Sequence, residues 1–248
     1  MHPHATPGAE VQEIENGWRL SIPAGDSSHY RDAQLDDYAG LPRSRFPHQA
    51  IKLSLRARAS SRDLPGTWGF GLWNDPFGLS IGFGVGRFRL PCLPNAAWFF
   101  HASRQNHLSF SNDQPASGFL AQAFNAPRYH PGLIPAGLAL PFSSKASRNL
   151  LSKMVAENAV SVDVNVIDWH EYKIEWKPGR TEYWVDQVQV FESDVSPRPL
   201  LGLVIWIDNQ FAAFPPTGKI RFGVLENPEP AWIEITHLRI DQMTPGQN

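Results

Sequence analysis

Apolar and polar side chains alternate with a period of two along most of this chain. In IKLSLRARAS, residues 51–60, the residues Ile51, Leu53 and Leu55 fall on one side of an extended backbone, and Lys52 and its alternate neighbours fall on the other. This pattern is typical of a half-buried strand. It also predicts strands at residues 18–22, 68–74, 79–90, 97–103, 107–111, 118–124, 161–167, 201–207, 219–225 and 232–240. Many short strands separated by Gly, Pro and Asn turns indicate an all-β sandwich.

An aromatic ribbon, WHEYKIEWKPGRTEYWVDQVQVF at residues 169–191, has the clearest alternation. A Lys-Pro-Gly turn at 177–179 and a second tight turn at Asp186-Gln187 divide it into three antiparallel strands. Tyr183 and Val185 are predicted to face inward, and after the second turn Val188 is expected to do the same.

The one predicted helix covers residues 144–157, where Leu150, Leu151, Met154 and Val155 form an apolar face. It follows residues 125–142, an apolar stretch with four prolines and two glycines that is neither regular strand nor helix. The stretch either caps the core or covers a cleft as a lid. We therefore expect one domain over residues 1–248, with an ordered core at about 13–240, a lid insertion at 125–157 and loose tails at 1–12 and 241–248.

Three predicted strands, at 68–74, 79–90 and 201–207, have one bulky face and one face rich in glycine. Glycine inside a strand often marks a place where a ligand approaches the backbone, although a lid or helix packed on the glycines would also explain it. The glycine-rich faces also carry tryptophans, and Asp and Asn residues lie near the ends of the same strands. We expect a concave binding groove there, lined by Trp73, Asn74, Asp75, Trp206, Asp208 and Asn209.

Composition excludes several classes of function. A net charge of -2 disfavours a nucleic-acid binder, which needs clustered positive charge. The single Cys92 excludes an internal disulfide and a multi-cysteine metal site, and we expect neither a metal nor a cofactor. No apolar run is long enough for a signal peptide or a membrane span, so we expect no membrane partner and, by default, a cytoplasmic location. Composition does not indicate the oligomeric state.

Four segments, in the expected order from about residue 50 to 240, carry a family resemblance. DWHEYKIEW at 168–176 resembles the "F-H-x-Y-x-I-x-W" strand of the family 16 glycoside hydrolases, and YWVD at 183–186 stands in place of their "Y-V-D-G" hairpin. GTWGFGLWND at 66–75 resembles their "G-x-W-P-A-x-W" strand, and ITHLRI at 235–240 their closing "D-Y-V-R-V" strand. The resemblance implies the concanavalin A-like lectin/glucanase fold, a jelly roll of two antiparallel sheets, and a carbohydrate-active function.

The catalytic motif of that family is missing. Its members carry "E-[IL]-D-x-x-E" on the strand after the "W-P-A-x-W" strand, which supplies a nucleophile and an acid/base for retaining hydrolysis. Residues 95–103 here read NAAWFFHAS and contain no carboxylate. Retaining hydrolysis is therefore not supported on this strand, and relocated acids would have to come from Asp75, Asp208, Glu226 or Glu157.

Other chemistry rests on His101, the titratable group of that strand best suited to proton transfer, with Arg104 nearby. Trp98, His101 and Arg104 complete the predicted groove. A polysaccharide lyase that uses His101 is one alternative, and a half-buried structural histidine is another.

These features favour a protein that binds a polysaccharide or oligosaccharide in a groove. In a second hypothesis the groove binds or transforms a small apolar ligand under the lid, which the Trp98-Phe99-Phe100 run favours. In a third, the lid blocks the groove and the protein is a structural or interaction module.

Overall fold

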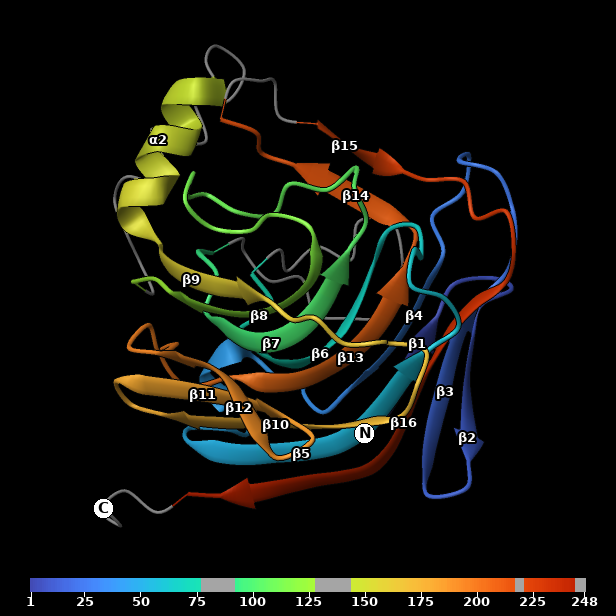
Figure 1. Cartoon of the computed structure of the whole chain (residues 1–248), viewed down its shortest axis with the longest axis horizontal. Coiled ribbons are helices and arrows are strands. Elements are labelled where there is room, and N and C mark those ends of the chain that lie inside the picture. Colours follow the sequence, from blue (N-terminus) through green and yellow to red (C-terminus); the bar gives the residue numbers. More distant parts are fainter. Residues whose placement is uncertain (77–91, 128–143, 217–220, 244–248) are drawn as a thin grey trace.

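A computed structural model describes residues 1–76, 92–127, 144–216 and 221–243, and the side chains of residues 144–147 and 150 are not part of this description. The described chain forms two large antiparallel sheets that pack face to face, sheet A above sheet B in Figure 1. This is the predicted β-sandwich.

Sheet A contains seven described strands. In spatial order they are β1 (His2–Ala5), β4 (Asp32–Asp36), β13 (Gly202–Asp208), β6 (Thr67–Trp73), β7 (Ala96–Ala102), β8 (Gly118–Asn125) and β9 (Ala156–Ser161).

Sheet B also contains seven described strands. In spatial order they are β12 (Val188–Ser193), β11 (Arg180–Val185), β10 (His170–Lys177), β5 (Ile51–Ala59), β16 (Ala231–Gln242), β3 (Gly17–Ile22) and β2 (Glu10–Ile14). Several strands that are adjacent in the sheet are distant in the sequence. Strand β5 pairs with both β10 and β16, which follow it more than 100 residues later. Such long-range pairing is typical of a jelly roll.

Three further groups of elements lie in the part of the chain that the structure describes. A 3₁₀ turn, η1 (Arg43–Arg45), precedes β5, and the helix α2 (Ser144–Met154) leads into β9. A small two-stranded sheet is formed by β14 (Gln210–Ala213) and β15 (Arg221–Val224). Figure 1 shows α2 and the β14–β15 pair on the side of sheet A that faces away from sheet B.

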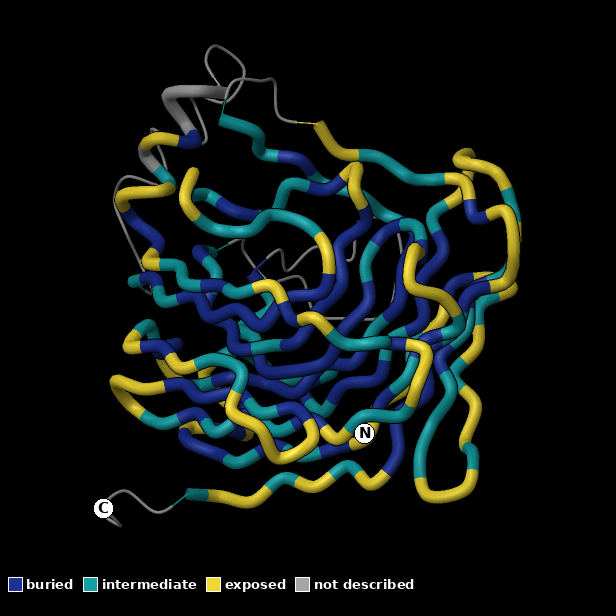
Figure 2. Tube along the Cα trace, viewed as in Figure 1, coloured by how far each residue is buried: buried dark blue, intermediate teal, exposed yellow. Residues whose placement is uncertain are grey.

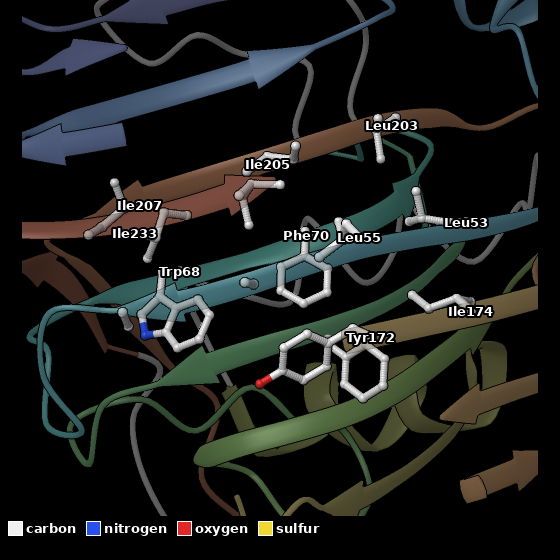
Figure 3. Packing of buried hydrophobic residues seen from close by; sticks show 14 of the residues in the cluster. Leu53, Leu55, Trp68, Phe70, Tyr172, Ile174, Leu203, Ile205, Ile207 and Ile233 are labelled. Atoms are coloured by element: carbon white, nitrogen blue, oxygen red, sulfur yellow. The ribbon is translucent and has the colours of Figure 1, made fainter. Parts of the chain in front are cut away.

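The core lies between the sheets, where the bulky faces of the strands meet (Figure 3). Trp68 and Phe70 of β6 point toward Leu55 of β5 and Tyr172 of β10, and all four are buried. Burial of one such side chain stabilises the fold by roughly 1.5–3 kcal/mol. Figure 2 shows the buried positions concentrated between the two layers and the exposed ones in turns and edges.

The aromatic ribbon forms β10, β11 and β12 of sheet B, as predicted. Tyr183 is fully buried, and its hydroxyl donates a hydrogen bond of 2.7 Å to the carbonyl oxygen of Gln122 in sheet A. Asp186 and Gln187 form the tight turn with φ values of 48° and 70°. His170 and Asp186 pair at 2.6 Å (Nδ1 to Oδ2) and connect this turn to β10.

Several local predictions are wrong. Residues 1–12 are not a loose tail, because β1 pairs with β4 and β2 pairs with β3. Residues 107–111 form no strand, and the strand predicted at 161–167 lies instead at Ala156–Ser161, because the helix ends three residues earlier than expected, at Met154. Val188 does not face inward and is 64% exposed. The predicted strand at 79–90 and residues 128–143 of the predicted lid lie outside the described residues.

Candidate functional site

Three tryptophans from three adjacent strands meet on the outer face of sheet A, the face directed away from sheet B. Trp206 of β13 lies parallel to Trp73 of β6, with 6.4 Å between ring centroids and an interplanar angle of 5°. Trp98 of β7 contacts both, at 5.5 Å from Trp206 and 6.2 Å from Trp73. All three remain partly exposed, and we call them the tryptophan cluster.

Each indole N–H of the cluster donates a hydrogen bond to a neighbouring side chain. Trp73 Nε1 donates to the hydroxyl of Tyr38 (2.7 Å), Trp98 Nε1 to Oε1 of Gln122 (3.1 Å) and Trp206 Nε1 to Oγ1 of Thr67 (2.9 Å). These bonds fix the orientation of the rings. With its polar edge occupied, each indole has only its ring face available for further contacts.

The glycines of β6 make room for this cluster. Gly69 is paired with Trp206 on one side and Phe100 on the other, and Gly71 is paired with Trp98. A Cβ on Gly71, whose φ is 156°, would lie 2.4 Å from the carbonyl oxygen of Ala97 and 2.5 Å from Trp98 Cβ. These glycines therefore serve close packing between strands, and we correct the expectation that they leave bare backbone for a ligand. Gly202 likewise lies against the ring of Tyr38.

Asp208 lies at the end of β13, next to the cluster. Its Oδ1 accepts hydrogen bonds from Thr67 Oγ1 (3.0 Å), the Thr67 backbone N–H (3.2 Å) and the Gln210 N–H (3.0 Å). A continuous chain of bonds thus runs from Trp206 through Thr67 to Asp208. Burial raises the pKa of Asp208 to about 7 in spite of these donors.

A second buried carboxyl, Asp32 of β4, is paired in register with Asp208. Burial and the neighbouring Asp208 raise its pKa well above the usual range, and Tyr30 is hydrogen-bonded to it. Two carboxyls this close cannot both ionise easily, so the pair retains a proton at a pH where free carboxyls have lost theirs.

At the other side of the cluster, Glu157 of β9 holds Gln122 in place. Its Oε1 accepts a hydrogen bond of 2.9 Å from Gln122 Nε2, and its Oε2 accepts one of 2.9 Å from the backbone N–H of Phe110. Burial raises the pKa of Glu157 although these donors oppose the shift. Trp98 is therefore oriented through Gln122 by a partly buried carboxyl.

The outer face of β7 carries no carboxylate. Ala96, Trp98, Phe100 and Ala102 alternate on that face, and Phe100 contacts Trp98 at 5.5 Å. By the resemblance to family 16 glycoside hydrolases, β7 is the strand that would carry the paired catalytic acids. A two-carboxylate displacement cannot start from these side chains.

Two predicted groove residues bind backbone instead. Asn74 donates to the Leu93 carbonyl (2.9 Å) and accepts from the Asn95 N–H (3.0 Å), which fixes the entry to β7. Asn209 is fully buried and accepts a bond of 2.8 Å from the Arg31 N–H.

Two other charged members of the predicted groove, Asp75 and Arg104, lie beyond the strand ends. Asp75 follows β6 with a φ of 46°, and its carbonyl accepts a hydrogen bond from Arg43. Arg104 is exposed in the loop after β7.

His101 does not lie with the tryptophans. Strand alternation turns it to the core side of β7, where it stacks on Trp68 with 5.9 Å between ring centroids. Burial lowers the pKa of His101 to about 4, so its ring is neutral at pH 7. Trp98 and His101 are three residues apart in one strand. Because residues at an odd spacing face opposite sides of a sheet, the sequence alone predicts that these two side chains do not share a face.

Sequence reasoning missed the supporting residues Tyr38, Thr67 and Gln122, and no pattern in the sequence pointed to Tyr38 or Thr67. Gln122 did carry a signal, because it is the single polar residue between Phe119 and Phe124. Within the described part of the chain, no group of three or more His, Cys, Asp or Glu residues is arranged to hold a metal ion. No helix in these residues is long and apolar enough to cross a membrane.

No protein-family model matches the chain, and no curated protein matches its sequence. Solved structures do match it. The κ-carrageenase of Pseudoalteromonas carrageenovora, solved with an oligosaccharide of κ-carrageenan, matches with a TM-score of 0.50 and 12% identity, over 94% of this chain and 88% of that one. A family 16 endo-glucanase from Bacteroides ovatus matches with a TM-score of 0.48 and 9% identity, over 95% and 86% of the two chains.

At this level of identity the likeness concerns the fold alone. The chain has the concanavalin A-like jelly-roll fold on which family 16 glycoside hydrolases are built, as the sequence predicted.

Proposed function

We propose that this protein binds a carbohydrate chain on the outer face of sheet A, with Trp73, Trp98 and Trp206 as the platform. The observation that carries this proposal is the tryptophan cluster itself, whose indole N–H groups are all occupied and whose rings remain partly exposed. Sugar rings present C–H faces that pack on indole faces, and their hydroxyls need polar neighbours. Gln34 of β4 pairs in register with Trp206, lies on the same side of sheet A and is partly exposed, so its amide supplies such a neighbour.

The κ-carrageenase with the same fold was solved with an oligosaccharide, which supports a carbohydrate ligand here. Binding without two-carboxylate hydrolysis is the function that these residues support best. The outer positions of β7 are apolar, and the carboxyls of Asp32 and Asp208 are both more than 90% buried. Neither is placed as a solvent-accessible nucleophile.

The test is calorimetry with oligosaccharides of β-glucan, galactan and alginate, on the wild type, Trp206→Ala and Trp206→Phe. Loss of one stacking face is expected to weaken binding by about 1 kcal/mol or more, roughly fivefold, with the phenylalanine variant in between. Trp184→Ala is the matched control, because Trp184 is also partly exposed but lies in sheet B, under Lys173 at 3.5 Å. If Trp206→Ala bound the oligosaccharide as tightly as the wild type, the tryptophan cluster would not be the binding platform. A reducing-end assay on the same substrates is expected to show no release of sugar.

A specific observation favours an apolar ligand as the second candidate. Aromatic contacts continue from Trp98 to Phe124 (6.1 Å) and on to Phe110 (6.3 Å), and Met154 of α2 belongs to the same apolar cluster. Saturable binding of an apolar fluorophore, lost in Trp98→Ala, together with no response to any oligosaccharide, would favour this candidate over the first.

A further inference from the structure

The outer face of sheet B, on the opposite side of the sandwich, carries a row of arginines and tryptophans. Arg58 of β5 lies between two indoles, 4.8 Å from the ring centroid of Trp169 and 5.4 Å from that of Trp232. Arg19 lies over Trp232 at 4.7 Å, and Arg56 over Trp169 at 5.5 Å. The row therefore consists of positive charges held by aromatic faces.

One carboxylate neutralises part of this positive charge. Glu234 accepts hydrogen bonds from Nε of Arg19 (2.9 Å) and Nε of Arg58 (2.7 Å), and it is buried between them. Arg56 and Arg239 have no hydrogen bond or ion pair with any other residue that the structure describes. Two exposed guanidinium groups are therefore left without a carboxylate partner on the same face.

A break in sheet pairing brings these two arginines to one pocket. Between Thr236 and Arg239, strand β16 contains a bulge relative to β5, and His237 in this bulge has a φ of 54°. The bulge opens a pocket of about 240 Å³ lined by Ser54, Leu55, Arg56, Glu171, His237 and Arg239. A non-glycine residue at positive φ is uncommon and marks a backbone shape that surrounding structure must hold.

We propose that this pocket binds an oxyanionic group, a sulfate, a phosphate or a carboxylate. A guanidinium group is planar and offers up to five N–H donors that match the oxygens of such groups. The stacking of Arg56 on Trp169 limits its motion while leaving its N–H edge free, and the Ser54 hydroxyl adds a donor. A bulge, an aromatic support and two unpaired arginines thus converge on one site.

Two acidic side chains near the pocket affect how strongly it attracts an anion. Glu171 lines it and opposes an anion. Asp186 lies near Arg56, which helps lower the pKa of Asp186, but its carboxylate is already bound by His170 (2.6 Å) and by the Glu171 N–H (2.9 Å). The two arginines therefore outnumber the one carboxylate that lines the site.

The experiment is a calorimetric titration of the full chain with sodium phosphate, sodium sulfate and sodium glucuronate at constant ionic strength, with chloride as the reference anion. Saturable binding of one of these anions is expected, and Arg56→Gln or Arg239→Gln should weaken it about tenfold or more. Glu171→Gln should tighten it severalfold because the repelling charge is gone. Which anion saturates the site distinguishes a tetrahedral oxyanion from a sugar-borne carboxylate.

Lys52→Gln is the matched control. Lys52 lies on the same side of β5 as Arg56 but does not line the pocket. Its substitution by Gln removes the same single positive charge as Arg56→Gln. Equal weakening by Lys52→Gln and Arg56→Gln would show diffuse charge attraction and overturn the proposal, as would an absence of saturable binding. Because all these positions lie on sheet B, the result is independent of the sugar platform on sheet A.

Discussion

Asp208 makes the stability of this protein depend on pH in an unusual direction. Burial raises its pKa from 3.8 to about 7 in the folded chain, whereas the unfolded chain retains the ordinary value. Because the pKa of Asp208 is higher in the folded chain than in the unfolded chain, the folded chain binds the proton more tightly at any pH between the two pKa values. The stability is therefore full below pH 4 and falls as the pH rises from about 4 to 7.

The difference between the two pKa values corresponds to about 4 kcal/mol at about 1.4 kcal/mol per pH unit. Asp208→Asn removes this dependence. An asparagine keeps an Oδ1 acceptor for Thr67 and Gln210, as the protonated acid does, and has no charge to bury. We expect the variant to be within about 1 kcal/mol of the wild type near pH 4.5 and to be more stable by several kcal/mol at pH 8.

Urea denaturation of both proteins at pH 4.5 and pH 8 measures the effect. Groups with lowered pKa values, such as Glu234 and Asp186, act in the opposite direction, but both proteins share them and the difference cancels their contribution. Asp32 adds to the expected effect, because it loses a charged neighbour in the variant. A stability difference that stays within about 1 kcal/mol across this range would refute the assignment of a raised pKa to Asp208.

Two further predictions concern backbone positions. Gly71→Ala should destabilise the protein by about 3 kcal/mol or more in urea denaturation, because the new Cβ would lie 2.4–2.5 Å from backbone and Trp98 atoms; a loss below 1 kcal/mol would contradict the packing described for β6. Gln187→Gly should raise stability by about 0.5–1 kcal/mol, because Gln187 has a φ of 70° in a turn that favours glycine. No gain would indicate that the Gln187 side chain stabilises the turn in other ways.

The fold was predictable because strand alternation is a strong local signal. IKLSLRARAS became β5 with the predicted inward face, and the three strands of the aromatic ribbon formed as expected. The strand DAQLD, residues 32–36, was missed because it is short and three of its five residues are polar, which the outer face of a sheet permits.

The candidate site was predictable only in part. Trp73, Trp98 and Trp206 were expected to share a face, and strand order brings them together. Asn74 and Asn209 could not be separated from ligand-binding residues, because an amide that binds backbone looks the same in sequence as one that binds a sugar. The cationic pocket was hidden for a related reason: Arg56 and Arg239 are 183 residues apart by their numbers, and only the bulge in β16 brings them together.

Carbohydrate binding on the tryptophan cluster can be observed in a crystal of the protein soaked with the best-bound oligosaccharide. We expect a pyranose ring packed on the exposed face of Trp73, Trp98 or Trp206, with its hydroxyls directed toward polar side chains of sheet A. A sugar bound elsewhere, with the tryptophan cluster unchanged and uncovered, would contradict it.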